Sequence, residues 1–597
     1  MTQNHKIANL QQRELKLRAL RRDILSKDSE TALDMILEAP SPATLVQSFP
    51  DQDLYYLMHK IGPHDFIPVL ALARSDQWEH VLDVEVWDDD RLNTDIMAKA
   101  FDFLFQADPE RFLRWIITEK PDYFEFFLLK NMIIHIREHD EPPPEDSDAY
   151  ITLDDKFYFR FPEQKSPEQK NEEGIDLDEP DPEKSQADET PELIEKMMKK
   201  LADMDLSVFH GLLLEVLSLL PAETEEEQFR LRNLRLAEKG FLPAHEAIGI
   251  YQPTDFKSLR KRSKTDIQNG YHPDIPLPPQ FFSLHIQGDD LFVRALARIP
   301  QELFFSLESE MAALTNKIIS ADRIRIREKD AIRETVEKAS AFLSLGLEVI
   351  LSSSEKPAKI TGTAAGKIIE TYFLEDIFRT GSRAGIRLKT RAQNWYKDSF
   401  LMENSLPLSF LSENFLGVIG GLFLDRPLYF DNYQTGKLYR NFKTLGDIEE
   451  TKTSLDQIIS LDKTLGKIKP DLTSFRQGVL TYKSMLLTLW ARNRIGLDRE
   501  PEAAGLDPIP LEKFKPFFKE MFSGPGDEDA APKENKDLVL NDLILWAADA
   551  AGSEPDPDFK NLLSKLVLEI EEEYGRVNPD QLDPRFTPHF LIRRENA

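Results

Sequence analysis

The chain of 597 residues contains no cysteine. This absence excludes disulfide bonds, thiolate zinc sites, iron–sulfur clusters and thiol nucleophiles. Because disulfides are not the means of stabilisation, the sequence fits a reducing compartment, and we expect a cytoplasmic protein.

The chain also lacks a long hydrophobic run of the kind that crosses a membrane, which needs about 18 apolar residues or more. Its best candidate, residues 123–136, is interrupted by Glu125, Lys130 and Asn131, which predicts a buried helix. The N-terminal segment carries charges throughout and has no apolar centre like that of a signal peptide. We therefore expect no membrane insertion.

Basic residues are scarce relative to acidic ones: 75 Lys and Arg stand against 105 Asp and Glu, a net charge of −30. Such a surface repels phosphate backbones and disfavours nucleic acid as a partner. Residues 138–192 hold 20 acidic and 5 basic residues, a net of −15, so half of the excess lies in one segment.

Hydrophobic residues make up 41% of the chain, with 38 phenylalanines, which is enough for substantial cores. The patterning predicts a predominantly all-α, multidomain protein. We expect these segments in order: a basic N-terminal helix over 1–30, a helical-hairpin superhelix over 31–139, an acidic disordered linker over 140–191, a helical body over 192–523, an acidic linker over 524–537, and a C-terminal helical pair and tail over 538–597.

Short apolar blocks follow helix-start signals in residues 31–139. Pro or a capping residue stands at each start, as in Ser41-Pro42, Asp108-Pro109 and Pro121-Asp122. Helices this short cannot bury their apolar faces alone, so we expect them to stack into a small right-handed superhelix.

One stretch of the acidic linker has the pattern of a strand. Phe157, Phe159 and Phe161 alternate with polar residues, and Asp154-Asp155 can form a turn. We expect a β-hairpin near 150–161 that packs on a helical domain, because an isolated hairpin is only marginally stable.

Three segments carry a resemblance to a known family: DLYYLMHKIGPHDFIPVLALARSDQWEHVLDVEVW (53–87), RLAEKGFLPAHEAIGIYQP (235–253) and FLEDIFRTGSR (373–383). They resemble an uncharacterised bacterial family, domain of unknown function 6178. The resemblance implies membership over most of the chain and brings no activity with it. The first segment is also similar in style to the short-helix cytosolic domain of bacterial magnesium transporters, but this chain has no transport segments.

Residues 135–139 match the inverted zinc-protease motif H-x-x-E-H, with His135, Glu138 and His139. On a helix, this spacing would place both histidines on one face, and Glu215 could supply a third ligand. The alternative is a set of polar residues at the C-terminus of a helix, where the dipole favours histidine.

Arginines recur every fourth residue at Arg379, Arg383, Arg387 and Arg391. On a helix they form a ridge of like charges that requires neutralisation. One hypothesis is ion pairing with neighbouring helices, and the other is an anion site for a phosphorylated ligand or an acidic protein segment. The acidic segment 163–192 is an intramolecular candidate, either on this ridge or on the basic segment 257–264.

The sequence favours an interaction or scaffold protein with an unknown protein partner, no cofactor and no catalytic activity of its own. Stacked helices form extended binding surfaces, and acidic linkers act as tethers. Two alternatives remain open: a metal-dependent hydrolase using the H-x-x-E-H motif, and a phosphate-ligand sensor using the arginine ridge.

Overall fold

The computed structural model describes residues 14, 16–138, 142, 144, 149–162, 190–252, 254, 258–263, 278–324, 330–353, 359–472, 480–497, 506–522 and 532–593. Helices dominate these residues, and the strands form only small sheets. The all-α prediction is therefore confirmed.

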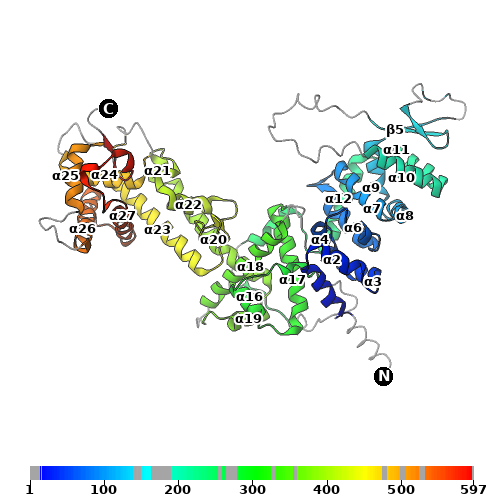
Figure 1. Ribbon diagram of the computed structural model, residues 1–597, viewed down its shortest axis with the longest axis horizontal. Coiled ribbons are helices and arrows are strands. Elements are labelled where there is room, and N and C mark those ends of the chain that lie inside the picture. Colours follow the sequence, from blue (N-terminus) through cyan, green and yellow to red (C-terminus); the bar gives the residue numbers. More distant parts are fainter. Residues whose placement is uncertain are drawn as a thin grey trace.

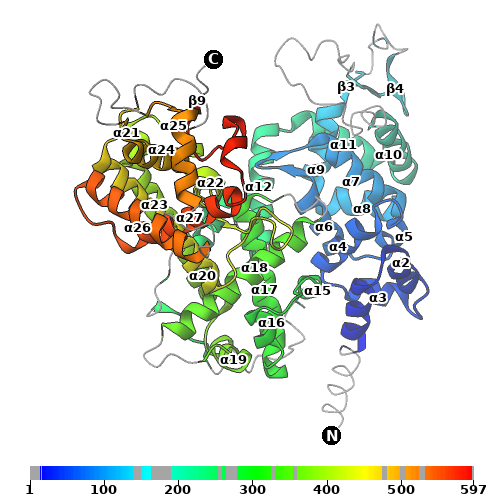
Figure 2. The same ribbon diagram turned by 60° about the vertical axis from the view of Figure 1, so that its left-hand side comes forward.

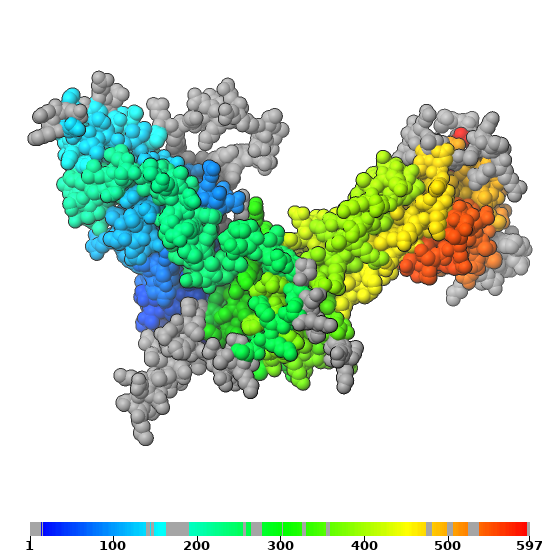
Figure 3. All heavy atoms as spheres, turned by 180° about the vertical axis from the view of Figure 1, so that it is seen from behind, coloured from blue at the N-terminus to red at the C-terminus, as the bar shows by residue number. Residues whose placement is uncertain are grey.

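The molecule has three parts, which Figure 1 shows side by side. An N-terminal arm (residues 29–238) and a C-terminal arm (residues 400–593) rise from a central body (residues 244–397). Viewed from behind, the surface between the two arms is a wide hollow (Figure 3). The buried apolar side chains of all three parts nevertheless belong to one connected core.

The N-terminal arm is a succession of short helices with two small sheets. Its helices are α2 (Ser29–Leu37), α3 (Pro42–Ser48), α4 (Asp51–Ile61), α5 (Ile67–Leu70), α6 (Ser75–Glu85), α7 (Thr94–Ala107), α8 (Pro109–Glu119), α9 (Pro121–Asn131), α10 (Thr190–Met204), α11 (Leu206–Ser218) and α12 (Pro221–Glu238). Its strands are β1 (Trp87–Asp88), β2 (Arg91–Leu92), β3 (Ile133–Ile136), β4 (Ile151–Thr152) and β5 (Phe157–Arg160).

Several of these helices begin where the sequence signals place them. Helices α3, α8 and α9 each have proline in the first turn, and the Asp108 side chain accepts a hydrogen bond from the Arg111 N–H at 3.1 Å. The helices pack against their neighbours along the arm, as stacking of short elements requires.

The basic helix at the N-terminus docks on the rest of the chain. Residues 16–26 are helical, Ile24 and Leu25 are buried, and Arg18 pairs with Glu308 of the central body. The helix is thus anchored by both apolar and ionic contacts.

The expected hairpin is present, but it belongs to a three-stranded antiparallel sheet in the order β3-β5-β4. Figure 2 shows this sheet at the end of the N-terminal arm. The turn lies at Asp154 and Asp155, and Asp155 takes a φ of +58°, a conformation that aspartate tolerates. Phe157 packs against Phe209 and His210 of α11, so the hairpin rests on a helical surface as predicted.

The helix that we expected over residues 123–136 ends earlier in the structure. Helix α9 ends at Asn131, and Ile133–Ile136 form strand β3. β-Branched isoleucines favour the extended backbone, and β5 offers a partner with Ile134 opposite Phe159. The pairing with a distant strand therefore overrides the local helical pattern.

The central body contains α13 (Ala244–Ala247), η4 (Ile248–Tyr251), α15 (Phe281–Leu284), α16 (Leu291–Leu296), α17 (Gln301–Asp322), α18 (Ala331–Ser352), α19 (Gly362–Thr371) and α20 (Leu374–Lys397). Helices α18 and α20 cross in close contact at Gly346 and Gly381. A Cβ at Gly381 would lie 2.1 Å from the carbonyl oxygen of Phe342, so only glycine permits this approach.

The C-terminal arm contains α21 (Phe400–Glu403), η6 (Leu408–Leu411), α22 (Ser412–Phe423), β6 (Tyr429–Phe430), β7 (Tyr439–Arg440), α23 (Leu445–Ile468), α24 (Tyr482–Ile495), β8 (Ile509–Pro510), α25 (Leu511–Phe522), α26 (Pro532–Ala551), α27 (Pro557–Tyr574), η8 (Pro579–Gln581), η9 (Pro584–Phe586) and β9 (Ile592–Arg593). Helix α26 begins at Pro532, inside the segment 524–537 that we expected to be a linker. The C-terminal end is tied back, because β9 pairs in parallel with β8.

No single helix in the described ranges is long and apolar enough to cross a membrane. Two bent helix pairs reach the required length and hydropathy only together: α11 with α12, bent by 103°, and Leu374–Glu403 with Leu408–Phe423, bent by 97°.

Candidate functional site

The H-x-x-E-H residues do not lie on a helix. His135 is on strand β3, where its ring contacts Tyr150 at 6.5 Å between centroids, and Glu138 follows that strand. His139 lies outside the described residues. The helical face that would have brought the two histidines together is therefore absent at His135.

Glu215, the predicted third ligand, is exposed on α11. Across the part of the chain that the structure describes, no three His, Asp or Glu side chains form a group that could hold a metal ion. A metal site that includes His139 remains a prediction.

The arginine ridge lies on one helix, α20, as predicted. Arg379 pairs with Glu375 at 2.7 Å, Arg383 donates to the Thr254 carbonyl at 3.0 Å, and Arg391 pairs with Asp456. Only Arg387 is exposed without a described ion pair. These contacts are the ones expected from the ion-pairing alternative, and anion binding remains a prediction.

The charge around Arg379 is well neutralised. Burial raises the pKa of Glu375, but the hydrogen bond from Lys317 at 2.8 Å and the charge of Arg379 outweigh it, so that this pKa lies below its ordinary value. Glu375 is therefore a negative centre that three cations share, because Arg260 also pairs with it at 3.7 Å.

The described part of the basic segment, residues 258–263, is also occupied by internal partners. Arg260 contacts both oxygens of the buried Asp376, the shortest ion-pair distance being 3.1 Å, and Arg262 pairs with Glu310. The acidic segment proposed to cover it, residues 163–192, lies outside the described residues up to 189. That intramolecular contact remains a prediction.

Helix α11 exposes a row of large apolar side chains, which we call the leucine row. Its members are Leu206 (45% exposed), Leu214 (51%), Leu217 (47%) and Leu220 at the turn into α12 (60%). The spacing of 206, 214 and 217 places these three on one helical face, beside the buried face formed by Phe209, Leu213 and Val216. Apolar residues thus cover more of α11 than packing against the described residues uses.

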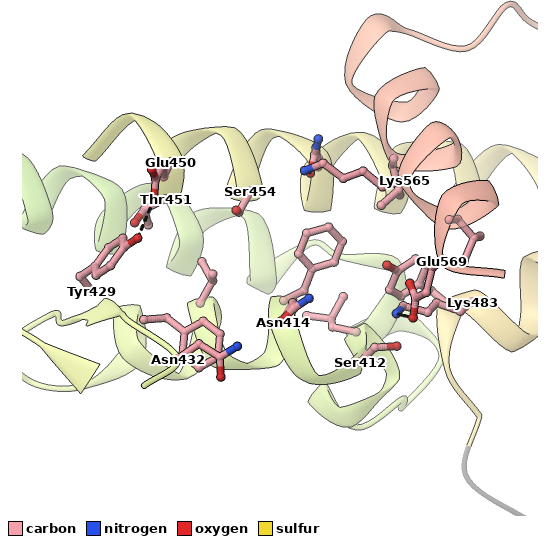
Figure 4. A pocket seen from close by; sticks show the side chains of 18 of the residues that line it. Ser412, Asn414, Tyr429, Asn432, Glu450, Thr451, Ser454, Lys483, Lys565 and Glu569 are labelled. Atoms are coloured by element: carbon pink, nitrogen blue, oxygen red, sulfur yellow. Dashed lines mark hydrogen bonds and ion pairs between the residues drawn. The ribbon is translucent and has the colours of Figure 1, made fainter. Parts of the chain in front are cut away.

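A cavity of about 280 Å³ opens in the C-terminal arm between α22, β6, α23, α24 and α27. Figure 4 shows Tyr429 and Glu450 at one end and Lys565, Lys483 and Glu569 at the other. Neutral polar side chains line the rest of it: Ser412, Asn414, Asn432, Gln434, Thr451, Ser454 and Gln457. Aromatic rings contribute the apolar part, with Phe415 stacked on Tyr482 at 5.6 Å.

Two walls of the cavity are each formed by one helical face. Residues 450, 454 and 457 follow one side of α23, and residues 562, 566 and 569 follow one side of α27. The β6–β7 hairpin closes a third side. It sits against α22 because Gly417 has no side chain: a Cβ there would lie 2.4 Å from the ring of Phe430.

The basic end of the cavity contains a chain of polar contacts. Glu569 pairs with Lys483 and lies 3.1 Å from His589 Nε2, and His589 Nδ1 is 2.7 Å from the Tyr574 hydroxyl. The hydrogen bond with His589 and the charge of Lys483 lower the pKa of Glu569 to about 2. Glu569 is therefore ionised at neutral pH and neutralises Lys483.

Ser412 is the unusual residue of the lining. Its backbone φ is +61°, in the region that disfavours residues with a side chain, and its buried hydroxyl has no hydrogen-bond partner among the residues that the structure describes. Strain and an unsatisfied buried group at the same residue are typical of functional sites.

The sequence did not reveal this cavity. Its lining extends from Leu411 to Glu569 over four helices and a hairpin, and none of these segments contains a recognisable motif. The run Gly417-Val418-Ile419-Gly420-Gly421 was the available signal, because clustered glycines mark close backbone approach. The leucine row was visible only as a strong apolar run at 209–220.

Nearly the whole chain, residues 9–593, matches the family described as "Family of unknown function (DUF6178)". No curated protein and no solved structure matches the chain. The likeness to the magnesium transporter domain therefore has no support from these comparisons.

Proposed function

We propose that this chain, which belongs to the DUF6178 family, is a protein-interaction scaffold that docks a protein partner on the leucine row of α11. The observation that carries the proposal is the exposure of Leu206, Leu214 and Leu217 on one face of α11. Contiguous exposed apolar side chains on a folded chain mark interaction sites.

A protein suits this surface better than a lipid bilayer does. Helices that lie on membranes carry Lys and Arg beside their apolar face, whereas the only charged residue of α11 is Glu215. The net charge of −30 also opposes approach to anionic lipid.

The same net charge disfavours a second copy of the chain as the partner, because two acidic surfaces repel each other. The partner we expect presents an amphipathic helix whose apolar side chains meet the leucine row and whose flanks are basic. Such a helix fits the leucine row because its own apolar side chains recur at the same helical spacing.

Site-specific photo-crosslinking in the native cell tests the proposal. A benzophenone amino acid at position 214 or 217 should form an adduct with one defined protein, while the same group at position 545 should not. Leu545 is the matched control, since it is 69% exposed but lies on α26 in the other arm.

The partner identified by the adduct is then purified and its affinity for the full chain is measured. The double variant Leu214→Glu/Leu217→Glu should bind at least about ten-fold more weakly, and Leu545→Glu should bind like wild type. Absence of a position-specific adduct contradicts the proposal, as does unchanged affinity of the double variant. Co-sedimentation of the wild type with anionic vesicles would point to a membrane instead.

A further inference from the structure

We propose that the cavity of the C-terminal arm binds a small zwitterion of dipeptide size, with its ammonium group at Glu450 and its carboxylate at Lys565. This site is in the arm opposite to the leucine row and is independent of the proposed scaffold function.

The assignment of the two ends follows from the charges of the lining. Lys483 and Glu569 neutralise each other. Glu450 accepts a hydrogen bond from the Tyr429 hydroxyl at 2.6 Å, and Lys565 donates to the Gln457 amide oxygen at 3.2 Å. Neither Glu450 nor Lys565 forms an ion pair with any residue that the structure describes. One anionic and one cationic group therefore stand at the exposed rim of the cavity without an ion-pair partner among the described residues.

The separation of these groups sets the length of the ligand. Glu450 and Gln457 are seven residues apart on α23, or about 10 Å along the axis. After allowance for a charge-assisted hydrogen bond at each end, about 5 Å remains between the charged groups of the ligand. One extra residue adds about 3.5 Å of extended chain, so the span fits a dipeptide better than a single amino acid.

Neutral groups between the two ends match a peptide unit. Gln457 is only 2% exposed, and its amide nitrogen has no hydrogen-bond partner within the described ranges. The buried Ser412 hydroxyl is likewise unsatisfied. An amide that both donates and accepts would satisfy these groups, and the rings of Phe415, Phe430 and Tyr482 offer an apolar surface to a side chain.

Calorimetric titration of the full chain with L-alanyl-L-phenylalanine tests the site. We expect saturable binding, and at least about ten-fold weaker binding of both the N-acetylated and the C-amidated dipeptide, since each modification removes one charge. Glu450→Gln and Lys565→Met should each weaken binding of the unmodified dipeptide by a similar factor.

The two variants should also distinguish the ends. N-acetylation of the dipeptide should not weaken its binding to Glu450→Gln any further, and C-amidation should not weaken its binding to Lys565→Met any further. Glu449→Gln and Lys560→Met are matched controls on the same two helices. Their side chains pair with Lys452 and Glu554 rather than lining the cavity, so they should bind like wild type.

Several results would overturn the proposal. They are no binding of the dipeptide at about 1 mM to the folded wild type, equal binding of the modified dipeptides, or full affinity in both Glu450→Gln and Lys565→Met. Thermal unfolding of each variant checks that it is folded. The leucine-row variant should bind the dipeptide like wild type, so failure here and failure of the scaffold function are separable.

Discussion

Two buried titratable residues contact residues that are distant in sequence. Asp53 of α4 is fully buried and accepts hydrogen bonds from the backbone N–H groups of Gln280 (2.8 Å) and Phe281 (2.9 Å) in the central body. His80 of α6 is buried beside Lys239, with 3.1 Å between Nδ1 and Nζ. Burial disfavours the charged form of each group. It therefore raises the pKa of the aspartate and lowers the pKa of the histidine.

Replacing Asp53 by Asn should remove one component of the pH dependence of stability. Burial raises the pKa of Asp53 from 3.8 to about 7 despite its hydrogen bonds. Between about pH 4 and 7 the folded state therefore binds the extra proton, and this group lowers the free energy of unfolding as pH rises, by up to about 1.4 kcal/mol per pH unit. Urea unfolding from pH 4.5 to 7.5 should show the loss of this slope in Asp53→Asn. Identical slopes of unfolding free energy against pH in the wild type and the variant would refute the raised pKa of Asp53.

His80→Gln should change stability on the acid side. Burial, reinforced by the charge of Lys239, lowers the pKa of His80 from 6.5 to about 3. The unfolded chain takes up this proton below pH 6.5 while the folded chain does not, so the contribution is present above pH 6.5 and is lost as pH falls toward 3. Chemical unfolding should show a shallower acid-side slope in His80→Gln. The control is His245→Gln, whose side chain is 80% exposed and whose replacement should leave the slope unchanged.

At the scale of elements, the local signals of helix starts were reliable and the choice between helix and strand was not. Proline and capping residues act within one turn, so Pro109 and Pro121 mark α8 and α9 correctly. Residues 133–136 became a strand because β5, more than twenty residues away in sequence, supplies the hydrogen bonds. Local propensity cannot report a partner that is distant in sequence.

The close contact between α22 and the β6–β7 hairpin at Gly417 can be tested by measuring the stability of an alanine variant. Gly417→Ala should lower the free energy of unfolding by about 1–3 kcal/mol, because the new Cβ overlaps the Phe430 ring. Gly466→Ala in α23 is the control. Nothing lies within 4 Å of its added Cβ, so the higher helix propensity of alanine should stabilise the protein slightly. Thermal unfolding of both variants distinguishes the cases, and equal shifts would contradict the assigned contact.

At the scale of the whole molecule, the two arms and the hollow between them make the protein extended (Figures 1 and 3). Polar contacts join segments that carried the family resemblance in the sequence. The Arg235 guanidinium binds both carboxylate oxygens of Asp83, at 2.6 and 2.8 Å, and so connects 235–253 to 53–87. Residues that are far apart in sequence thus act as one structural unit.

Solution scattering should reveal this shape. A compact chain of 597 residues would have a radius of gyration of about 25 Å. We expect a larger value and a pair-distance distribution with a shoulder for the arm-to-arm distances. A variant lacking residues 164–188 controls for the contribution of the acidic segment. A value near 25 Å with one symmetric peak in this variant would show that the arms close in solution.

The sequence by itself determined the helical class, several helix starts, the small hairpin and the family, since these depend on composition and on signals within a few residues. Tertiary structure decided the functional surfaces. It placed Arg379 and Arg391 against carboxylates, left the leucine row exposed, and brought Glu450 and Lys565 to one cavity. Whether a charge is neutralised or an apolar face is covered depends on elements distant in sequence, and only the folded chain brings those elements together.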